Sequence, residues 1–391
     1  MKILFYRYGS ICEPDIIEGF QSLGFEVIET NIEVTNKNLA PSECVEHVSK
    51  ILLPGGFSFV FTINFFPWLS DLCQILKLRY ISLIVDSPVL ELFSKSLSNS
   101  FNRVFLFDLN LYKDFKEENP GHIYHTPLYA NTDRLDKYLE NVSETQKEKF
   151  RTDISFIGSS YEEKNPYSTA KFNDYYKGYH DALIDAQLNV YGLNFLDEAA
   201  SDEFCDYFIE NVDHLYRFPP DSREDKKALV TQAHLSYRVA EKERKLALNM
   251  LGEKYKLDFY TQSPLKDFRN IRFRGNARSL EEMPIIFNQS KINLNFTSKA
   301  IKSGIPLRVF DILGSGGFLI TNYQTELLEY FENGKDLVVY EDLNHLVELC
   351  GYYLEHEDER IEIAKNGHET VKKYHNVTTR LLQIIDLAFK D

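Results

Sequence analysis

The chain has 391 residues, a length that favours two or three domains over one. Hydrophobic residues make up 43% and aromatic residues 14%, which is ample for large cores and argues against general disorder. The net charge of -15 argues weakly against a non-specific nucleic-acid or anionic-membrane binder, because such proteins usually carry a basic face.

The five cysteines are scattered along the chain and form no C-x-x-C pair. This pattern argues against a disulfide framework and against a zinc site, and it favours reduced, mostly buried thiols in a cytosolic protein. The opening MKILFYRYGS has too short an apolar run before its first polar residues to be a signal peptide, and it predicts a first strand. We therefore expect a cytoplasmic protein.

Short apolar strands alternate with helical patterns in the first third of the chain. Residues 2–8 predict a strand, 13–24 a helix and 25–31 a second strand, which together predict a parallel sheet. The alternation continues with the segments 57–64, 66–78, 79–86, 103–108 and 122–129. These elements predict a Rossmann-like domain over residues 1–135.

One uncharged segment, residues 51–69, could be mistaken for a membrane span. Its middle, FSFVFTI, alternates large apolar residues with others at the period of a strand. Two prolines and two glycines also interrupt it. We therefore predict a strand here and no membrane span.

The composition changes after residue 135. Residues 136–152 are charged and polar and predict a linker, and the apolar segment DISFIGSS at 153–160 then opens a second domain. A stretch rich in Tyr, Asp and Lys, about 165–255, predicts helices. A second strand-helix series follows up to residue 375, and residues 376–391 predict a C-terminal helix that packs back on the N-terminal domain.

The predicted fold class is therefore α/β, with two Rossmann-like domains whose parallel sheets face each other across a cleft. Ligands of such sheets bind outside the carboxyl ends of the strands.

The stretch SGIPLRVFDILGSGGFLITNY, residues 303–323, is the first candidate site. Pro306 suits the first turn of a helix with Ser303 or Gly304 before it as the cap, and the free N–H groups of that turn would suit a phosphate. Arg308 would oppose the helix dipole there, and Asp311 on nearly the same face could bind a vicinal diol such as ribose.

The glycines that follow, Gly314, Gly316 and Gly317, would let a ligand approach the backbone closely. The alternative is a surface Arg308–Asp311 ion pair followed by a tight helix-to-strand turn. The spacing alone favours this alternative.

A second loop, Arg274, Gly275 and Asn276, ends a predicted strand before a helix that Ser279 and Glu282 would begin as a capping box. Such a loop could receive a nucleotide base through its main-chain groups, and an ordinary strand-to-helix loop is an equally good interpretation.

Polar residues also follow the predicted strands of the first domain. Asp86 and Asn64 each stand at the end of a strand, and His125 lies beside the crossing between the domains. Asp86 or His125 could act as a base or bind hydroxyl groups. For each, a capping or hinge role is the favoured alternative.

Several motifs are absent from the sequence. There is no D-x-D, which argues against a transferase that holds its nucleotide through a metal on that motif. There is no G-x-x-x-x-G-K-[ST], and Gly9 is not part of a G-x-G-x-x-G, which lowers a nicotinamide or flavin interpretation.

The order of these motifs resembles a known family. Residues 291–371 carry an asparagine-rich strand, an Arg-x-Phe-acid helix, a glycine pair, an apolar strand and a YYLEH helix, and they resemble the C-terminal domain of the CgeB-like (spore maturation protein-like) glycosyltransferases. FVFTINFFPWLSDLC, YISLIVDSP, FLFD and HTPLYAN resemble the N-terminal domain that often accompanies it, and DISFIGSSYEEKNPY resembles the start of the second half. The likeness covers most of the chain apart from about 165–255.

The resemblance implies a GT-B fold that binds a nucleotide sugar, UDP-linked in our interpretation, mainly through the C-terminal domain and without a catalytic metal. It implies ribose binding by Asp311, a diphosphate partner in Arg308, and a base facing Arg274–Asn276. Glycogen-synthase-type families have a glutamate eight residues before the ribose-binding acid, and here that residue is Ser303. This departure puts a copied retaining mechanism in doubt.

We therefore expect a cytosolic hexosyl- or N-acetylhexosaminyltransferase that moves a sugar from its nucleotide donor to a glycan, protein or small-molecule hydroxyl. We expect no cofactor besides the donor and no nucleic-acid partner. Two alternatives stay open: a non-catalytic nucleotide- or carbohydrate-binding protein on the same scaffold, and a nucleotide-sugar epimerase.

Overall fold

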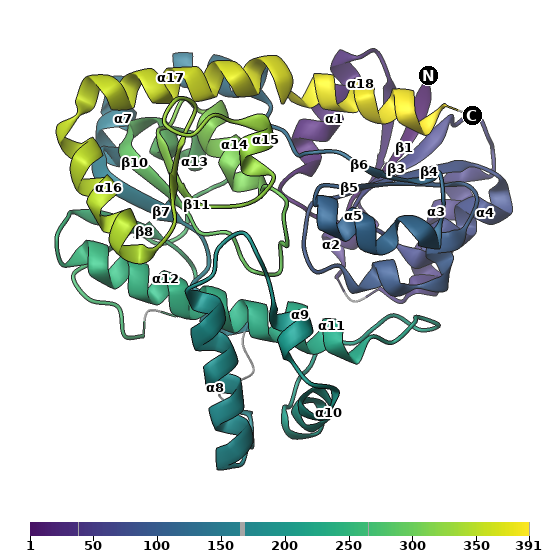
Figure 1. Cartoon of the computed structure of the whole chain (residues 1–391). Coiled ribbons are helices and arrows are strands. Elements are labelled where there is room, and N and C mark those ends of the chain that lie inside the picture. The colour runs from purple at the N-terminus through teal and green to yellow at the C-terminus, as the bar shows by residue number, and fades with distance from the viewer. Residues whose placement is uncertain (38, 165–168, 265, 391) are drawn as a thin grey trace. The chain divides into compact units, whose positions relative to one another are not determined.

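The computed structural model describes residues 1–37, 39–164, 169–264 and 266–390. The chain divides into two compact units. Unit 1 comprises Met1–Asn131, Arg217–Glu224 and His375–Asp391, and unit 2 comprises Thr132–Tyr216 and Asp225–Tyr374. The elements are labelled in Figure 1.

Unit 1 is built on a six-stranded sheet in the order β2-β1-β3-β4-β5-β6, and every neighbouring pair of strands is parallel. Its strands are β1 (Lys2–Tyr6), β2 (Glu26–Thr30), β3 (Phe59–Ile63), β4 (Arg79–Ile84), β5 (Asn102–Leu106) and β6 (Ile123–His125). Its helices are α1 (Glu13–Ser22), α2 (Ile32–Thr35), α3 (Pro41–Leu52), α4 (Pro67–Leu76), α5 (Leu109–Phe115) and α18 (Val377–Ala388), with short 3-10 turns at Leu90–Phe93, Lys95–Ser98 and Lys116–Glu118.

The last helix of the chain belongs to unit 1. Helix α18 packs on α1, as Figure 1 shows, and a Cβ added to Gly19 of α1 would lie 2.7 Å from the Leu381 side chain of α18. Strand β3 is buried at all five positions because it lies inside the sheet with both faces covered. None of the helices in the described ranges of the chain is long and apolar enough to cross a membrane.

Unit 2 contains a second six-stranded parallel sheet in the order β12-β11-β10-β7-β8-β9. Its strands are β7 (Thr152–Ile157), β8 (Leu257–Tyr260), β9 (Arg272–Phe273), β10 (Ser290–Asn295), β11 (Leu319–Asn322) and β12 (Val338–Tyr340). Its helices outside the insert described below are α6 (Thr132–Glu140), α7 (Glu144–Phe150), α12 (Ser236–Gly252), α13 (Glu282–Gln289), α14 (Leu307–Gly314), α15 (Leu327–Tyr330), α16 (Leu343–Glu355) and α17 (Glu357–Tyr374), with a 3-10 turn at Glu162–Lys164.

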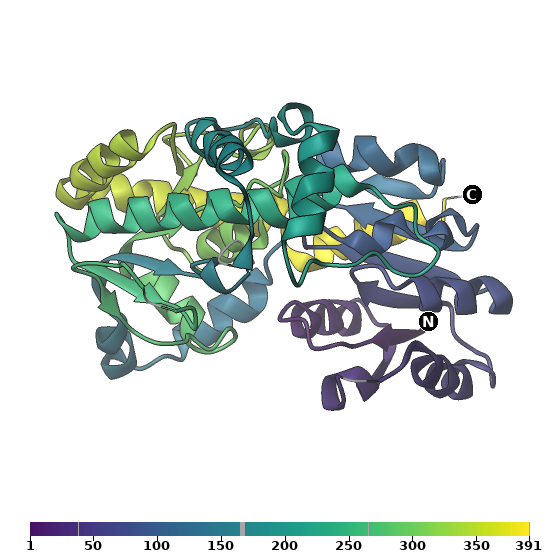
Figure 2. The same ribbon diagram turned by 90° about the horizontal axis from the view of Figure 1, so that it is seen from below.

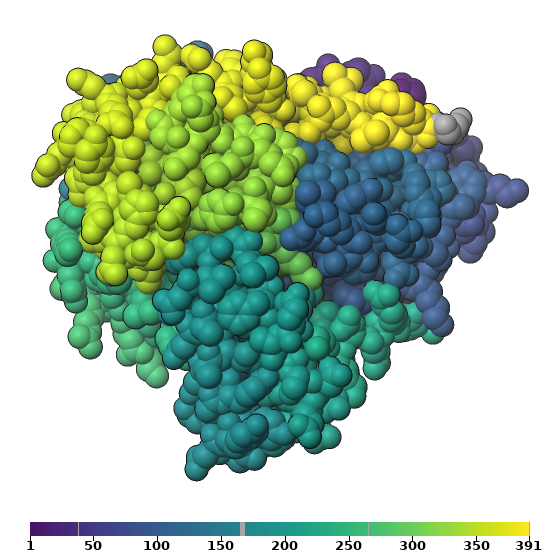
Figure 3. Space-filling model, viewed as in Figure 1, coloured from purple at the N-terminus to yellow at the C-terminus, as the bar shows by residue number. Residues whose placement is uncertain are grey.

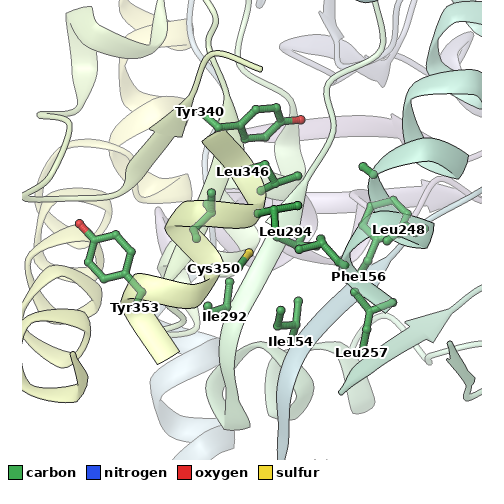
Figure 4. Packing of buried hydrophobic residues seen from close by; sticks show 14 of the residues in the cluster. Ile154, Phe156, Leu248, Leu257, Ile292, Leu294, Tyr340, Leu346, Cys350 and Tyr353 are labelled. Carbon is green, nitrogen blue, oxygen red and sulfur yellow. The ribbon is translucent and has the colours of Figure 1, made fainter. Parts of the chain in front are cut away.

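The core of unit 2 lies between its sheet and helices α12 and α16. Figure 4 shows Ile154, Phe156, Ile292 and Leu294 of the sheet pointing toward side chains of these two helices, and Leu248 of α12 lies among them. Figure 2 shows the long helix α12 running across this unit. In the space-filling view, α16 and α17 form one continuous yellow-green surface of unit 2 (Figure 3).

The stretch between β7 and α12 contains helices, as its composition predicts. They are α8 (Asp174–Leu188), α9 (Leu196–Ala199), α10 (Asp202–Asn211) and α11 (Lys226–Val230), followed by a π-helical turn at Thr231–Leu235 that runs into α12. We call residues 169–235 the helical insert. Its helices enclose a core of their own around Phe204 and Phe208. Residues 165–168 of the predicted stretch lie outside the described residues.

Candidate active site

The strand order of unit 2 locates its ligand crevice. The chain moves from β7 outward to β8 and β9, returns to β10 on the other side of β7, and then moves outward to β11 and β12. The direction of winding therefore reverses between β7 and β10, and ligands of open parallel sheets bind at such a switch point, outside the carboxyl ends of the strands. The loops after β7 and β10 flank this position.

A buried arginine joins these two loops. Arg244 of α12 donates from Nη1 to the Ser159 carbonyl, at 2.7 Å, and from Nη2 to the Phe296 carbonyl, at 2.6 Å. Its guanidinium lies 4.3 Å from the centre of the Tyr161 ring and is 8% exposed. Because the two carbonyls belong to the loops after β7 and β10, Arg244 fixes the separation of the loops at the switch point.

Side chains from the surrounding segments hold the loop 296–306 that follows β10. Asn194 of the helical insert donates to the Lys299 carbonyl, at 2.6 Å. Gln324, after β11, donates to the carbonyls of Ile301 and Gly304, both at 3.2 Å. These hydrogen bonds hold the loop in one conformation, which suits a binding role for the helix that follows it.

A buried charged side chain, that of Lys299, belongs to the same loop. The Lys299 ammonium is 4.0 Å from the centre of the Tyr191 ring. Burial lowers the pKa of Lys299, and the negative charge of Glu243 acts in the opposite direction. Glu243 is fully buried and accepts a hydrogen bond from the Tyr340 hydroxyl at 3.5 Å. The charge of Glu243 therefore offsets only part of the cost of burying the Lys299 ammonium.

The expected cap of α14 differs from the observed one. The helix begins at Leu307 with Pro306 as its N-cap, and neither Ser303 nor Gly304 caps it. The Ser303 hydroxyl donates instead to Oε1 of Glu326, at 2.7 Å, and both residues are buried. Ser303 stands where glycogen-synthase-type families have a glutamate. It is thus paired with a carboxylate from the segment after β11.

Arg308 and Asp311 lie together on α14, as their spacing predicts. Nη1 of Arg308 is 3.8 Å from Oδ2 of Asp311 and 3.1 Å from the sulfur of Met283, and the guanidinium lies 5.2 Å from the centre of the Phe287 ring. Both charged side chains keep partial exposure, 20% for Arg308 and 30% for Asp311. Contacts with α13 therefore position the guanidinium while leaving part of it open to a ligand.

The loop Arg274–Asn276 lies at the same carboxyl edge, after β9. Asp258 of β8 is fully buried and accepts hydrogen bonds from both Nε and Nη2 of Arg272 at 2.6 Å, while Nε of Arg274 is 3.8 Å from its carboxylate. Hydrogen bonding to Asp258 raises the pKa of Arg272. Gly275 and Asn276 are exposed and Arg274 is half-buried, and Gly275 has φ +74 with open space where a Cβ would stand.

The predicted Ser279–Glu282 capping box is wrong. Helix α13 begins at Glu282, and the Glu282 carboxylate accepts the backbone N–H of Arg278, at 3.0 Å. A turn at Ser279 and Leu280 brings the Arg278 N–H close to the start of the helix. The residue that pairs with Glu282 is therefore four positions before it, where the capping box places it three positions before.

Gly316 and Gly317 lie away from the other predicted donor-binding residues of unit 2. They lie just before β11, at the amino edge of the sheet, because α14 runs back from the carboxyl edge to the amino edge. A Cβ on Gly317 would lie 2.6 Å from the Phe287 carbonyl oxygen and 2.8 Å from the Asn293 side chain. Packing against α13 and β10 thus explains why residue 317 is glycine.

This packing predicts that Gly317→Ala lowers the free energy of unfolding by about 1–3 kcal/mol, since the new methyl group would overlap a backbone oxygen. The UDP affinity that the family resemblance implies should stay unchanged. Denaturant unfolding and calorimetry measure the two quantities. Gly178→Ala in α8 is the control: its Cβ would meet nothing within 4 Å, and alanine in a helix should be neutral or stabilising. A loss of UDP affinity without a loss of stability would contradict the packing explanation.

In unit 1 the strand order reverses between β1 and β3, and polar side chains gather there. Nδ2 of Asn64, after β3, donates to Oδ2 of Asp86 at 2.7 Å and to the Tyr8 hydroxyl at 3.0 Å. Burial, followed by the charge of Asp86, raises the pKa of Tyr8. This hydrogen bond from Asn64 orients the Asp86 carboxylate. Because Asp86 is exposed, its carboxylate is also reachable from solvent.

His125 ends β6, at the same carboxyl edge of unit 1 as Asp86. Strand β5 separates β4 from β6, so the ends of the two strands are about 10 Å apart. The His125 ring is half-buried and lies 6.4 Å from the ring centre of Tyr112 in α5. The structure does not bring Asp86 and His125 into direct contact.

The Gly9–Ser10 loop of unit 1 already contains an anion from its own chain. Oε1 of Glu13 accepts the backbone N–H groups of Tyr8, Gly9 and Ser10 at 2.8, 2.8 and 3.0 Å, and Arg7 donates to Oε2 at 3.0 Å. Glu13 is fully buried. The donors that could hold a phosphate are thus used to close the loop after β1.

Three residues at these edges are not among those expected from the sequence: Arg244, Tyr8 and Glu326. Tyr8 stands just after the first strand and could have been found by the rule that led to Asn64. Arg244 and Glu326 act on loops far away in the sequence, and no local pattern marks them. In the part of the chain that the structure describes, no group of three or more His, Cys, Asp or Glu residues is placed to hold a metal ion.

Residues 232–386 match a family model described as glycosyl transferase-like. A search of curated proteins finds no match to the sequence. Among solved structures, the chain is similar to HepE from Anabaena in complex with UDP-glucose, with 12% sequence identity, a TM-score of 0.56, and 99% of this chain and 98% of that chain covered.

The chain is also similar to a UDP-forming α,α-trehalose-phosphate synthase from Burkholderia xenovorans (13% identity, TM-score 0.55, 99% of this chain and 98% of that chain). A glycosyltransferase from Rickettsia africae ESF-5 is another similar structure (14% identity, TM-score 0.54, 99% and 97%). At these identities the likeness concerns the fold. The chain has the GT-B fold, with two Rossmann-like units that are each built on a six-stranded parallel sheet.

Proposed function

We propose that this protein is a glycosyltransferase that moves a sugar from a nucleotide-diphosphate donor, a UDP-sugar, to a hydroxyl acceptor. The observation that carries the proposal is the partly exposed Arg308–Asp311 pair on α14, which follows a preorganised loop beside the switch point of unit 2. The fold is shared with a solved structure that contains UDP-glucose, and residues 232–386 match the glycosyl transferase-like model. The CgeB-like family is the subfamily we propose.

In this proposal the Arg308 guanidinium binds the diphosphate, since a planar fork of donors matches phosphate oxygens. Asp311 accepts hydrogen bonds from the ribose hydroxyls, and the phosphates lie beside the loop at Gly304, a residue that is itself buried. The base lies toward Arg274–Asn276. The ends of β10 and β9 are three strand spacings apart, about 14 Å, which is of the size of an extended nucleoside diphosphate.

The reaction breaks the bond between the anomeric carbon and the phosphate oxygen of the donor, and it forms a bond from that carbon to the acceptor oxygen. The acceptor hydroxyl loses its proton to a base, and we propose Asp86 or His125 for this role. UDP leaves with the electron pair of the broken bond. Arg308 stabilises the charge that develops on it, which is the role that a metal ion plays in other transferases.

We propose a hexosyl- or N-acetylhexosaminyltransferase of the cytoplasm whose acceptor is a glycan, a protein or a small molecule. The donor is the only cofactor-like molecule in this proposal, and no nucleic acid takes part. The absence of a D-x-D motif from the sequence and the cation on α14 support a reaction without a metal.

A thermal-shift panel of nucleotides and nucleotide sugars, followed by a transfer assay with and without EDTA, tests the function. A donor held at 100 times its dissociation constant should add about 2.7 kcal/mol to the free energy of unfolding, and EDTA should leave turnover unchanged. The absence of a shift with every nucleotide would rule out the donor site. Loss of turnover in EDTA would rule out the metal-independent mechanism.

The same assay separates the main alternative, a non-catalytic binding protein. Ser303, at the position where related enzymes carry a glutamate, donates to Glu326 and leaves no carboxylate of its own there. UDP-sugar binding without hydrolysis or transfer to any acceptor would favour this alternative. Conversion of the sugar without an acceptor would indicate an epimerase.

A further inference from the structure

Unit 2 contains a pocket at the amino edge of its sheet, the edge opposite the proposed donor site. Its volume is about 380 Å³. The first residues of β7 and β10, the segment before β11, the end of α13 and the first turns of α17 line it, and we call it the amino-edge pocket. Figure 1 shows α7 and the start of α17 at the same end of unit 2. The pocket is of the size that small-molecule ligands occupy.

The charge of the pocket is opposite to that of the chain. Four cations and two carboxylates line it, which leaves an excess of two positive charges on a protein with a net charge of -15. The cations are Arg151, Lys256, Lys291 and Arg360, and the carboxylates are Asp153 and Glu357. A cavity lined by an excess of one sign concentrates counter-ions of the other sign.

The carboxylates do not neutralise every cation. Nζ of Lys291 is 2.8 Å from Asp153, and Nη2 of Arg360 is 3.4 Å from Glu357. Nη1 of Arg151 is 2.5 Å from Glu148 and its Nη2 is 3.6 Å from Glu144, two carboxylates outside the lining. Lys256 is exposed, and its ammonium has no hydrogen bond or ion pair with any residue that the structure describes. A bound anion would give this ammonium a partner.

Two buried groups of the wall point to a built site. Arg360 is only 5% exposed, and its guanidinium donates from Nη1 to the Tyr353 carbonyl at 2.9 Å; burial lowers its pKa. Thr152 is 5% exposed, and its hydroxyl has no hydrogen-bond partner in the described ranges. A buried hydroxyl without a partner costs free energy, and because this oxygen lies below the accessible surface a ligand reaches it only when the wall shifts. Gly316, with φ +71, leaves the backbone of the wall uncovered.

We propose that the amino-edge pocket binds a small multivalent oxyanion, a metabolite that carries phosphate or carboxylate groups. The site is separate from the proposed donor site because β7 runs from Thr152 at the pocket to Ile157 at the switch point, about 17 Å. The ligand therefore binds without touching a donor sugar.

Calorimetry and thermal shift on the full chain with millimolar inorganic phosphate or citrate test the proposal. At least one of the two anions should bind, and Lys256→Glu should weaken that binding about tenfold, which corresponds to about 1.4 kcal/mol. Lys254→Glu is the matched control, since Lys254 is exposed, nearby in sequence and outside the pocket. Phosphate and citrate as separate arms distinguish phosphorylated from polycarboxylate ligands.

Arg308→Ala separates this site from the donor site, because an anion in the amino-edge pocket should bind this variant as tightly as the parent. No binding of either anion would overturn the proposal. The proposal would also be overturned if Lys254→Glu and Lys256→Glu weakened anion binding equally. It would be overturned as well if Arg308→Ala lost anion binding while Lys256→Glu kept it. Lys256→Ala should weaken binding less than Lys256→Glu, and unchanged thermal midpoints without anion would show that both variants fold.

Discussion

Arg308→Ala is expected to lower the rate of sugar transfer by about 10²–10³-fold, because the departing diphosphate would lose the preorganised cation that stabilises its charge. UDP affinity should fall as well, since Arg308 is proposed to bind the diphosphate in the ground state. Arg308→Lys should give an intermediate rate, because lysine keeps the charge and loses the planar fork. Steady-state kinetics with a UDP-sugar and calorimetry with UDP measure these effects.

The fold should tolerate this change. The Arg308–Asp311 pair is 3.8 Å long and partly exposed, and such pairs contribute about 0–1 kcal/mol to stability. Arg278→Ala is the matched control: Arg278 is an exposed arginine before α13 that pairs with Glu281 and Glu282. Its loss should leave the rate unchanged. Unchanged turnover and unchanged UDP affinity in Arg308→Ala would disprove the leaving-group role.

Acid is expected to destabilise the helical insert between about pH 6.5 and 4. Burial lowers the pKa of His180 to about 4, and it lowers the pKa of His234 to about 4 as well. Both imidazoles are therefore neutral in the folded chain and bind protons near pH 6.5 when unfolded. Since the unfolded state binds more protons in this window, the free energy of unfolding falls as the pH falls, by about 1.4 kcal/mol per pH unit for each histidine.

The surroundings of the two rings support this expectation. Neither ring nitrogen of His234 has a hydrogen-bond partner in the described part of the chain, and its ring lies 5.4 Å from that of Tyr216. Nδ1 of His180 is 3.1 Å from the Asp181 carboxylate, which raises its pKa by less than burial lowers it. Below about pH 4 both folded rings also bind protons, and this source of pH dependence ends.

Denaturant unfolding at several pH values between 4 and 7 measures the slope. His234→Phe keeps an aromatic ring of similar size and removes one titrating group, so the slope should fall by about 1.4 kcal/mol per pH unit. His214→Asn is the control, since His214 is exposed in the same insert and asparagine tolerates its positive φ of 61. An identical slope for His234→Phe and the parent would contradict the assignment.

The sequence by itself determined the two alternating strand-helix series, the place of most strands and the helical content of the insert. These features follow from the local periodicity of apolar residues, which depends on neighbours within one or two turns. The spacing of Arg308 and Asp311 also sufficed to place them on one helical face. The position of the Arg274–Asn276 loop at the carboxyl edge followed from its place after a strand.

Only the tertiary structure decided which groups meet across the sheet. Arg244 donates hydrogen bonds to the loops after β7 and β10, and Glu326 accepts one from the Ser303 hydroxyl. Glu13 accepts a hydrogen bond from the backbone N–H of Gly9. The first two depend on the order β12-β11-β10-β7-β8-β9, which pairs segments far apart in the chain. Glu13 is only four residues from Gly9, but whether its carboxylate turns into the loop depends on how α1 packs. Gly316 and Gly317 lie at the opposite edge because a helix that starts at the carboxyl ends of the strands must return before the next strand begins. Local patterns report how a segment folds, whereas the contacts of a site depend on how distant segments pair and pack.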